Sequence, residues 1–473
     1  MSFAGPSNYS FFQIIKTRLE SYKSGQGPGK TKTRSVNEKK VRIEGKIVGV
    51  NYFESVYSPM VTASFLQEDT GGTTEDDDTG MPGTLKDTLP VEGFEDVLFR
   101  IGTGSGYLKF DNQKNKCFVI SGSPYNIDTM QKQTAFFPMI SKNAVRSANN
   151  PVKDLYPEAP ISEIVQKILN KGALKIPKRR LFIEKTKNKL KVVGDSQTPL
   201  DTVLKLCNKS IPADGGDPGY FFFETQSGYH FKSIQGLIKE GINQYGKAVQ
   251  GFAHTGTLRL GAGELDPAKH PFPLYRYSSL IDANLDNDKN NFKVLKPPVV
   301  RRDQDQINAL KNGQYTVRVC TVDPVTQEYK EEIISLEDNP NNSFLGDFEV
   351  DNNPTDEPTP YCQTYSYVLN YDKEDGVIDN PSEYEPRAMM KYGLLHSQLV
   401  DIQIPCNVTL EAGHVIKLMF ENITQGNKVE HAYNEHRSGF YLILHLCHHF
   451  DSSNSFTSLT LARDGYGLYN TTK

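Results

Sequence analysis

The 473-residue sequence contains no tryptophan, no closely spaced pair of cysteines and no long apolar run. Its six cysteines lie far apart, and because zinc ribbons and disulfide frameworks need close, ordered pairs, we expect neither. No window approaches the roughly 20 apolar residues of a membrane span, and the opening MSFAGPSNYS lacks the basic and apolar segments of a signal sequence. These absences predict a soluble protein with free, buried thiols that is assembled in a reducing cytosol.

A strong net charge is also missing. The 53 Lys and Arg residues nearly balance the 57 Asp and Glu residues, so the net charge of −4 gives no global field that would attract nucleic acid or an anionic membrane. Tyrosine, phenylalanine, glycine and proline are plentiful instead, which favours strands and turns. The chain is too long for one compact core, and its length predicts about three or four modules.

The first 140 residues change character at Val41. Residues 1–40 combine an apolar stretch at 11–15, which allows a helix, with the run SGQGPGKTKTRSVNEKK, and we expect a flexible basic arm. From Val41 onward apolar residues alternate with polar ones, as in VRIEGKIVGV, which predicts strands. We assign residues 41–140 to an antiparallel β-barrel, interrupted by an exposed acidic loop around Asp77.

Residues 141–235 carry helical and strand patterns together. Apolar residues recur at helical spacing over 161–169, and Thr198 followed by Pro199 predicts the start of a second helix. The segment GYFFFETQSGYHFKS predicts a hairpin of two aromatic strands. We therefore expect a small α+β domain.

The remainder alternates between weak and strong β patterns. Residues 282–395 are rich in Asn, Asp, Pro and Tyr, and we assign them to a loop-rich inserted domain. NVTLEAGHVIKLMF predicts a hairpin over residues 411–413, and the segments GFYLILHLCHHF and SFTSLTLARD predict another. We assign residues 236–281 and 396–473 to a second barrel. The predicted fold class is mainly β with α+β insertions: two antiparallel β-barrel domains and two decorating domains.

The candidate assembly and core residues lie on these last strands. Alternation places four apolar side chains of residues 440–447 on one face, and Tyr441, Ile443, His445 and Cys447 on the other. Because both faces are largely apolar, each needs cover, either by packing within the chain or by a neighbouring subunit. The candidates are Phe440, Leu442, Leu444, Leu446, Val415 and Leu418.

No motif predicts a catalytic residue or a bound cofactor. The run SGQGPGKT nearly matches a phosphate-binding loop, but Ser24 replaces its first glycine and no buried strand precedes it. The basic residues at 30–42 allow binding of DNA, although docking to another protein is favoured because no aromatic residues are interleaved. Glycoside hydrolysis needs only two suitably placed carboxylates and stays open.

Two patterns resemble metal sites without completing them. His445 and His449 share a strand face with Cys447, but zinc needs three or four converging donors, so hydrogen-bonded sheet histidines are favoured. The acidic run at 282–288 lacks the glycine and the final carboxylate of a calcium loop, since Asn287 and Lys293 stand there. We predict no metal site.

Several segments, in this order, resemble the baseplate hub proteins of contractile-tailed (myovirus-type) bacteriophages. The segments are NYFESVYSPMVTASFLQEDTG, FFPMISKNAVRSANNPVKDLY with PISEIVQKIL, GYFFFETQSGYHFKSIQGL, PCNVTLEAGHVIKLMF and SGFYLILHLCHHFDSSNSFTSLTLARDGYG. The resemblance covers most of the chain and is weakest in 1–35 and 282–395. The resemblance does not extend to the N-terminal arm or to the acidic loop.

The resemblance implies that both barrels are tail-tube-like and that a homotrimer forms a pseudo-sixfold ring. Such a ring joins the hexameric tail tube to the trimeric central spike, contacts the baseplate wedge proteins and lets viral DNA through its lumen without specific binding. The implied protein is structural and not an enzyme, lies in the virion tail and is assembled in the host cytoplasm. We expect neutral to acidic lumen faces, because positive charge would hold DNA. A tail-associated cell-wall-degrading enzyme and another tail-tip or tube-initiator protein are the alternatives.

Overall fold

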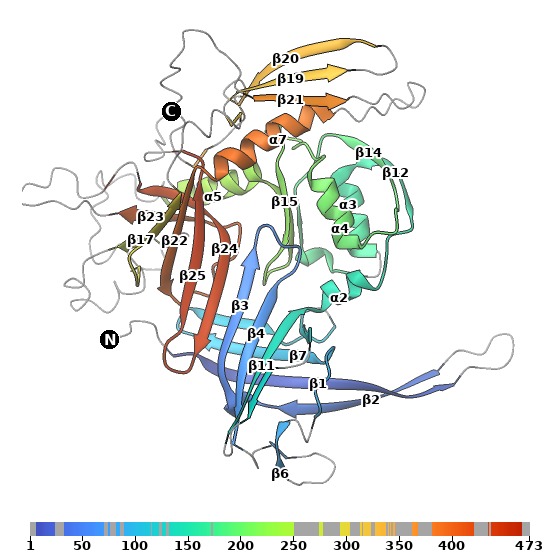
Figure 1. The fold of residues 1–473 in the computed structure, drawn as a ribbon, viewed down its shortest axis with the longest axis vertical. Coiled ribbons are helices and arrows are strands. Elements are labelled where there is room, and N and C mark those ends of the chain that lie inside the picture. Colours follow the sequence, from blue (N-terminus) through green and yellow to red (C-terminus); the bar gives the residue numbers. More distant parts are fainter. Residues whose placement is uncertain are drawn as a thin grey trace, which may run out of the picture.

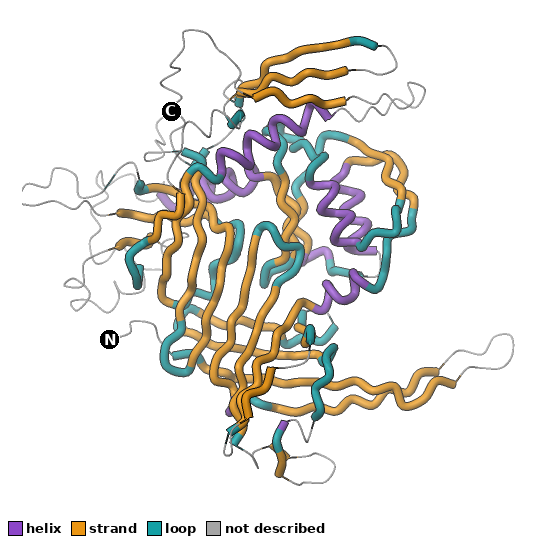
Figure 2. Tube along the Cα trace, in the orientation of Figure 1, coloured by secondary structure: helices purple, strands orange, loops and turns teal. Residues whose placement is uncertain are grey.

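Strands dominate the computed structural model of the chain, as the alternating sequence pattern predicts (Figures 1 and 2). The described residues are 6–23, 33–70, 74–75, 82–85, 89–114, 116–122, 125–128, 132–171, 174–249, 274–277, 294–302, 313–314, 316–322, 327–336, 339, 341, 344–345, 362–367, 381–420, 434 and 437–465. Within them, no helix is both long and apolar enough to cross a bilayer.

The described helices and strands follow one another along the chain in this order: β1 (Asn8–Lys23), β2 (Thr33–Arg42), η1 (Glu44–Lys46), β3 (Ile47–Ser55), β4 (Thr62–Asp69), β5 (Thr74–Glu75), β6 (Pro82–Gly83), β7 (Asp96–Thr103), β8 (Gly106–Phe110), β9 (Phe118–Ile120), β10 (Tyr125–Asp128), β11 (Gln133–Ser141), α2 (Lys142–Ala148), β12 (Leu155–Pro160), α3 (Ile161–Lys171), η2 (Lys178–Arg180), β13 (Leu181–Ile183), β14 (Lys189–Val193), α4 (Pro199–Cys207), β15 (Tyr220–Glu224), β16 (Tyr229–Ser233), α5 (Ile234–Val249), β17 (Leu274–Tyr277), β18 (Val299–Arg302), β19 (Thr316–Val322), β20 (Tyr329–Ser335), β21 (Cys362–Tyr367), α7 (Pro381–Leu395), β22 (Gln398–Pro405), β23 (Val415–Phe420), β24 (Gly439–Asp451) and β25 (Phe456–Arg463).

One large sheet of 15 described strands runs through the molecule in the order β18-β22-β25-β24-β3-β4-β11-β9-β7-β1-β2. We call the part from β3 to β1, with β8 and β10, the first lobe, and β17, β18 and β22 to β25 the second lobe. The two lobes join where β24 pairs antiparallel with β3, from His445↔Ser55 to Asp451↔Gly49. One apolar core spans both lobes, from Phe12 and Phe65 to Ile402 and Leu459. The lobes are therefore continuous in both hydrogen bonding and packing.

In the first lobe the sheet folds across itself. Strands β7 and β1 run across the direction of β3, β4 and β11 (Figure 1). Aromatic rings fill the space between these layers: Phe65 stacks on Phe137 at 4.5 Å, and Phe12 lies 4.9 Å from Phe65. Such closely spaced rings suit a pleated, two-sided core.

The prediction of a flexible arm at residues 1–40 is wrong for residues 8–15, which belong to β1. Residues 8–15 pair with β7, and Phe12 and Ile14 are completely buried in the shared core. Ile15 packs on the other face, against Leu98 and Cys117. The stretch forms a strand and not a helix because a partner strand takes up its backbone hydrogen bonds and both of its apolar faces find cover. The glycine-rich SGQGPGKT lies outside the described residues.

The α+β region has the elements that the sequence predicts. Helix α3 covers 161–171, and α4 begins after Thr198, whose hydroxyl accepts a hydrogen bond from the Asp201 N–H. Strands β15 and β16 form the predicted aromatic hairpin. Phe222 packs into the core of α3 and α4, whereas Phe223 packs toward the second lobe. Strand β15 therefore lies between two apolar cores, which explains why all five of its residues are buried.

Within residues 282–395, the described parts include strands and a helix. Strands β20, β19 and β21 form a separate sheet, and Val317 and Val319 pack on helix α7 through Met390 and Leu394. Strand β18 pairs instead with β22 at the end of the large sheet. The calcium-like run at 282–288 lies outside the described residues.

The predicted hairpin over residues 411–413 is also wrong. Residues 407–410 form a turn, in which the Asn407 carbonyl side chain accepts from the Thr409 N–H, and not a strand. Strand β23 pairs with β24, through Val415↔Leu442, and with β17. The hairpin of β24 and β25 is confirmed.

Candidate functional site

The candidate assembly residues lie on β23 and β24, and the first half of β24 is covered on both faces. Phe440, Leu442 and Leu444 of β24 pack with Val415 against Leu237 of α5 and the β15 strand. Tyr441 and Ile443 point to the opposite side, into the core that the lobes share, as does Leu418 of β23. The chain itself therefore covers these side chains. Their role in contacts between subunits remains a prediction.

A bulge changes the alternation of β24 at Leu444. The register with β25 shifts between Ile443 and His445. Leu446 consequently points into the shared core and not to the face of Leu442, which corrects the predicted common face. The outward side of the second half carries His445, Cys447 and His449, which are exposed or half-buried.

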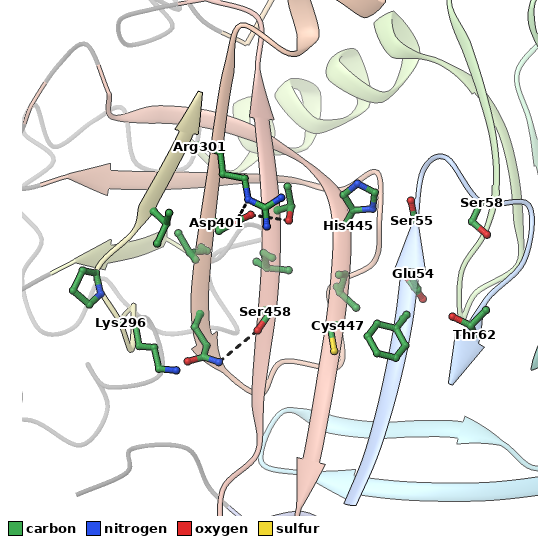
Figure 3. A pocket seen from close by; sticks show the side chains of 18 of the residues that line it. Glu54, Ser55, Ser58, Thr62, Lys296, Arg301, Asp401, His445, Cys447 and Ser458 are labelled. Carbon is green, nitrogen blue, oxygen red and sulfur yellow. Dashed lines mark hydrogen bonds and ion pairs between the residues drawn. The ribbon is translucent and has the colours of Figure 1, made fainter. Parts of the chain in front are cut away.

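Two of these outward residues, His445 and Cys447, line a shallow depression of about 460 Å³ on the face of β22, β25, β24 and β3 (Figure 3). Asp401 forms an ion pair with Arg301 and accepts a hydrogen bond of 2.8 Å from the Thr460 hydroxyl. Burial raises the pKa of Cys447 to about 11. The thiol therefore stays protonated near neutral pH and is a poor nucleophile.

The histidines of β24 are separated by their own partners. His449 shares a hydrogen bond of 2.6 Å with Asn51, and His445 lies 5.5 Å from the ring of Tyr57. His448 points the other way, buried against Thr457. Among the described residues no three His, Cys, Asp or Glu side chains are close enough to hold a metal ion. Two further histidines that precede β24 in the sequence, His431 and His436, lie outside the described residues.

A cluster of polar side chains is buried where three described parts of the chain meet. We call it the carboxylate junction: Glu54 of β3, Glu411 of the β22–β23 connection and the hairpin turn at 224–228. Glu54 accepts hydrogen bonds from the Gln226 N–H at 2.7 Å and the Ala412 N–H at 2.8 Å. Glu411 accepts from the hydroxyls of Thr225 and Ser227, both at 2.7 Å. The junction thus connects the first lobe, the second lobe and the α+β domain.

Burial dominates the electrostatics of the junction. The side chain of Glu54 is withdrawn from water, and together with the nearby charge of Glu411 this raises its pKa to about 8, although hydrogen bonds from Tyr52, Ala412 and Gln226 oppose the shift. His230 is stacked between Phe182 and Phe223, and burial lowers its pKa to about 3. The imidazole is therefore neutral when the protein is folded near neutral pH.

The junction does not have the arrangement of a nucleophilic triad. In such a triad the histidine lies between the hydroxyl and the carboxylate. Here the Ser227 hydroxyl donates directly to Glu411. His230 faces both groups with one nitrogen, Nε2, which lies 3.2 Å from the Ser227 hydroxyl and 3.9 Å from the Glu411 carboxylate, so the imidazole does not bridge them. The depression described above is lined by Glu54, but not by Ser227 or His230. The arrangement suits holding parts of the chain together.

The sequence contained a signal for this cluster that motif analysis does not use. Val50, Tyr52 and Glu54 alternate on one face of β3, so the glutamate occupies a core-facing position. A charged residue in such a position requires buried hydrogen-bond donors. Apart from the hydroxyl of Tyr52, the donors to Glu54 come from residues far away in the sequence, so their identity could not be predicted.

No family model matches the chain, and no curated protein matches it either. Solved structures do. A tail protein from Neisseria meningitidis MC58 is similar over 96% of this chain and 97% of its own, with 9% identity and a TM-score of 0.46. The 43 kDa tail protein of prophage MuSo2 from Shewanella oneidensis is similar over 96% and 99%, with 7% identity and a TM-score of 0.46. The E. coli c3393 protein, a component of the type VI secretion system, is similar over 96% and 79%, with 10% identity and a TM-score of 0.38. At these values we transfer no residue role to this chain.

Proposed function

We propose that the chain is a structural baseplate hub of a contractile phage tail. In this role three copies form a pseudo-sixfold ring that joins the hexameric tail tube to the trimeric central spike. The ring contacts wedge proteins and lines the channel for viral DNA, and the protein resides in the virion.

The observation that carries the proposal is the joining of two β lobes into one sheet with one core. A sheet and core that run through both lobes make each copy a rigid double segment, as a ring wall requires. The ordered resemblance of five segments to hub proteins supports the same assignment. We propose that each lobe corresponds to one tube-like barrel, with residues 141–235 and 282–395 as decorations.

The mass of the assembled protein tests this proposal. Native mass spectrometry of the full chain is expected to give the mass of three copies. Addition of the spike protein is expected to give one complex of three copies of this chain with three copies of the spike protein. Electron microscopy of that complex is expected to show a ring with a central channel whose faces are neutral to acidic. A chain that remains monomeric alone and with the spike protein contradicts the hub assignment, and peptidoglycan cleavage in a zymogram supports the enzymatic alternative.

A further inference from the structure

The first two strands extend beyond the rest of the molecule as a two-stranded ribbon. Strand β1 pairs with β7 only up to Ile15↔Asp96, whereas its pairing with β2 continues from Lys16↔Lys39 to Lys23↔Thr33. Among the described strands, β2 is the last of the sheet and has no neighbour other than β1. Figure 1 shows this part, the ribbon of residues 16–23 and 33–39, projecting away from both lobes.

The base of the ribbon is fixed to the first lobe. Lys16 is buried, and its ammonium group lies 2.9 Å from a Glu92 carboxylate oxygen and 3.7 Å from one of Glu95. The guanidinium group of Arg42 lies 5.5 Å from the ring centre of Phe11. The ribbon therefore leaves the lobe in a set direction.

The ribbon and its connection are strongly basic. Residues 16–39 contain seven Lys and Arg residues and two Glu residues, which gives a net charge of +5, so the rest of the chain carries −9. Like charges on paired strands repel one another, and an isolated two-stranded hairpin is at best marginally stable in water. A ribbon of this composition is stabilised when an acidic surface covers it.

We infer that this ribbon docks on an acidic surface of a second copy of the chain. The copy supplies the opposite charge, because the rest of the chain outside residues 16–39 has a net negative charge. The contact is head-to-tail, since it joins the ribbon of one copy to a different surface of the next, and such contacts close into rings when the rotation fits. The inference rests on the proposed ring and names the element that holds neighbouring copies together.

A charge reversal with a matched control tests it. The triple variant Arg18→Glu, Lys23→Glu and Arg34→Glu changes the ribbon, and Lys187→Glu, Lys189→Glu and Lys191→Glu makes the same change in net charge at exposed positions elsewhere. The ribbon variant is expected to weaken self-association at least about tenfold, measured by analytical ultracentrifugation, while the control associates like the wild type. Raising salt from about 50 to about 500 mM is expected to weaken the wild-type contact as well.

Each outcome has one interpretation. A wild type that stays monomeric overturns the ring and this inference together. A wild-type trimer with an equally stable ribbon variant overturns the inference alone, as does equal weakening by both triple variants. A photo-crosslinking amino acid in place of Tyr22, in a mixture of isotope-labelled and unlabelled chains, is expected to give crosslinks between copies, and crosslinks confined to one chain contradict it.

Discussion

At the scale of single residues, the carboxylate junction buries charged groups that are costly to withdraw from water. Glu54 is 3% exposed and Glu411 is 8% exposed, and two carboxylates this deep are tolerated only because hydroxyl and backbone N–H donors surround them. The tyrosine hydroxyl of Tyr52, at 2.6 Å, completes the set around Glu54. The arrangement makes stability depend on the proton of one side chain.

Glu54 is expected to make the protein less stable as the pH rises. Its pKa is about 8 in the folded chain against an ordinary value of 4.5, so the folded state binds the proton more tightly between these values. The stability that this provides is fully present below pH 4.5 and is lost as the pH rises through 8. Glu54→Gln is expected to flatten the fall in melting temperature over this pH range. It is also expected to lower the free energy of unfolding by about 1–3 kcal/mol, because an amide cannot accept all three hydrogen bonds from Tyr52, Gln226 and Ala412. A thermal-shift series over pH measures this.

The matched control for that series is Glu158→Gln, which changes an exposed carboxylate. It is expected to leave both the melting temperature and its pH dependence unchanged. An unaltered pH slope in Glu54→Gln would show that Glu54 does not hold its proton in the folded chain.

Gly228 closes the turn of the same junction. A Cβ atom there would lie 2.2 Å from the carbonyl oxygen of Arg180, which is backbone and cannot rotate away. Gly228→Ala is therefore expected to destabilise the chain by more than about 3 kcal/mol in chemical denaturation. Gly45→Ala, where nothing lies within 4 Å, is the control and is expected to stay within about 0.5 kcal/mol. Equal stability of the two variants would contradict this placement of the turn.

At the scale of elements, β24 is the strand on which both lobes depend. Its first half pairs with β23 and its second half with β3, while β25 pairs along both. Leu442 and Leu444 are 0% and 2% exposed. Replacing both by aspartate buries two unpaired charges, at several kcal/mol each, against a total stability of about 5–15 kcal/mol.

The double variant Leu442→Asp and Leu444→Asp is therefore expected to abolish folding, seen as insoluble or protease-sensitive protein. His445→Asp, on the same strand but facing out, is expected to remain folded. Normal solubility and assembly of the double variant would refute the placement of β24 in the core.

The sequence predicts elements well wherever the pattern is local. The helical spacing of apolar residues predicts α3, and Thr198 followed by Pro199 predicts the start of α4. The alternation of apolar and polar residues predicts β24 and β25. It could not predict the bulge at Leu444, because a bulge adds one residue without changing the apolar pattern. Strand β1 was missed because its short apolar stretch fits a helix equally well until β7 is known to pair with it.

At the scale of the whole molecule, the two lobes share one sheet and one apolar core. Strands β3 and β24 are about 390 residues apart in the chain, a separation that no local pattern records. Their pairing joins the two parts of the sheet, and because the core is shared, loss of one lobe would expose apolar surface of the other. The carboxylate junction adds the α+β domain to the same body through Gln226 and Ala412.

The lobes are accordingly expected to unfold together. In hydrogen exchange along a denaturant series, peptides from β4 in the first lobe and β25 in the second are expected to lose protection at the same midpoint, since neither keeps its core without the other. The sheet of β19 and β20 is the internal reference, because it packs on α7 in a core of its own and is expected to open at lower denaturant. Two separate midpoints for β4 and β25 would mean that each lobe is stable alone. This result would contradict the rigid double segment that the proposed ring wall requires.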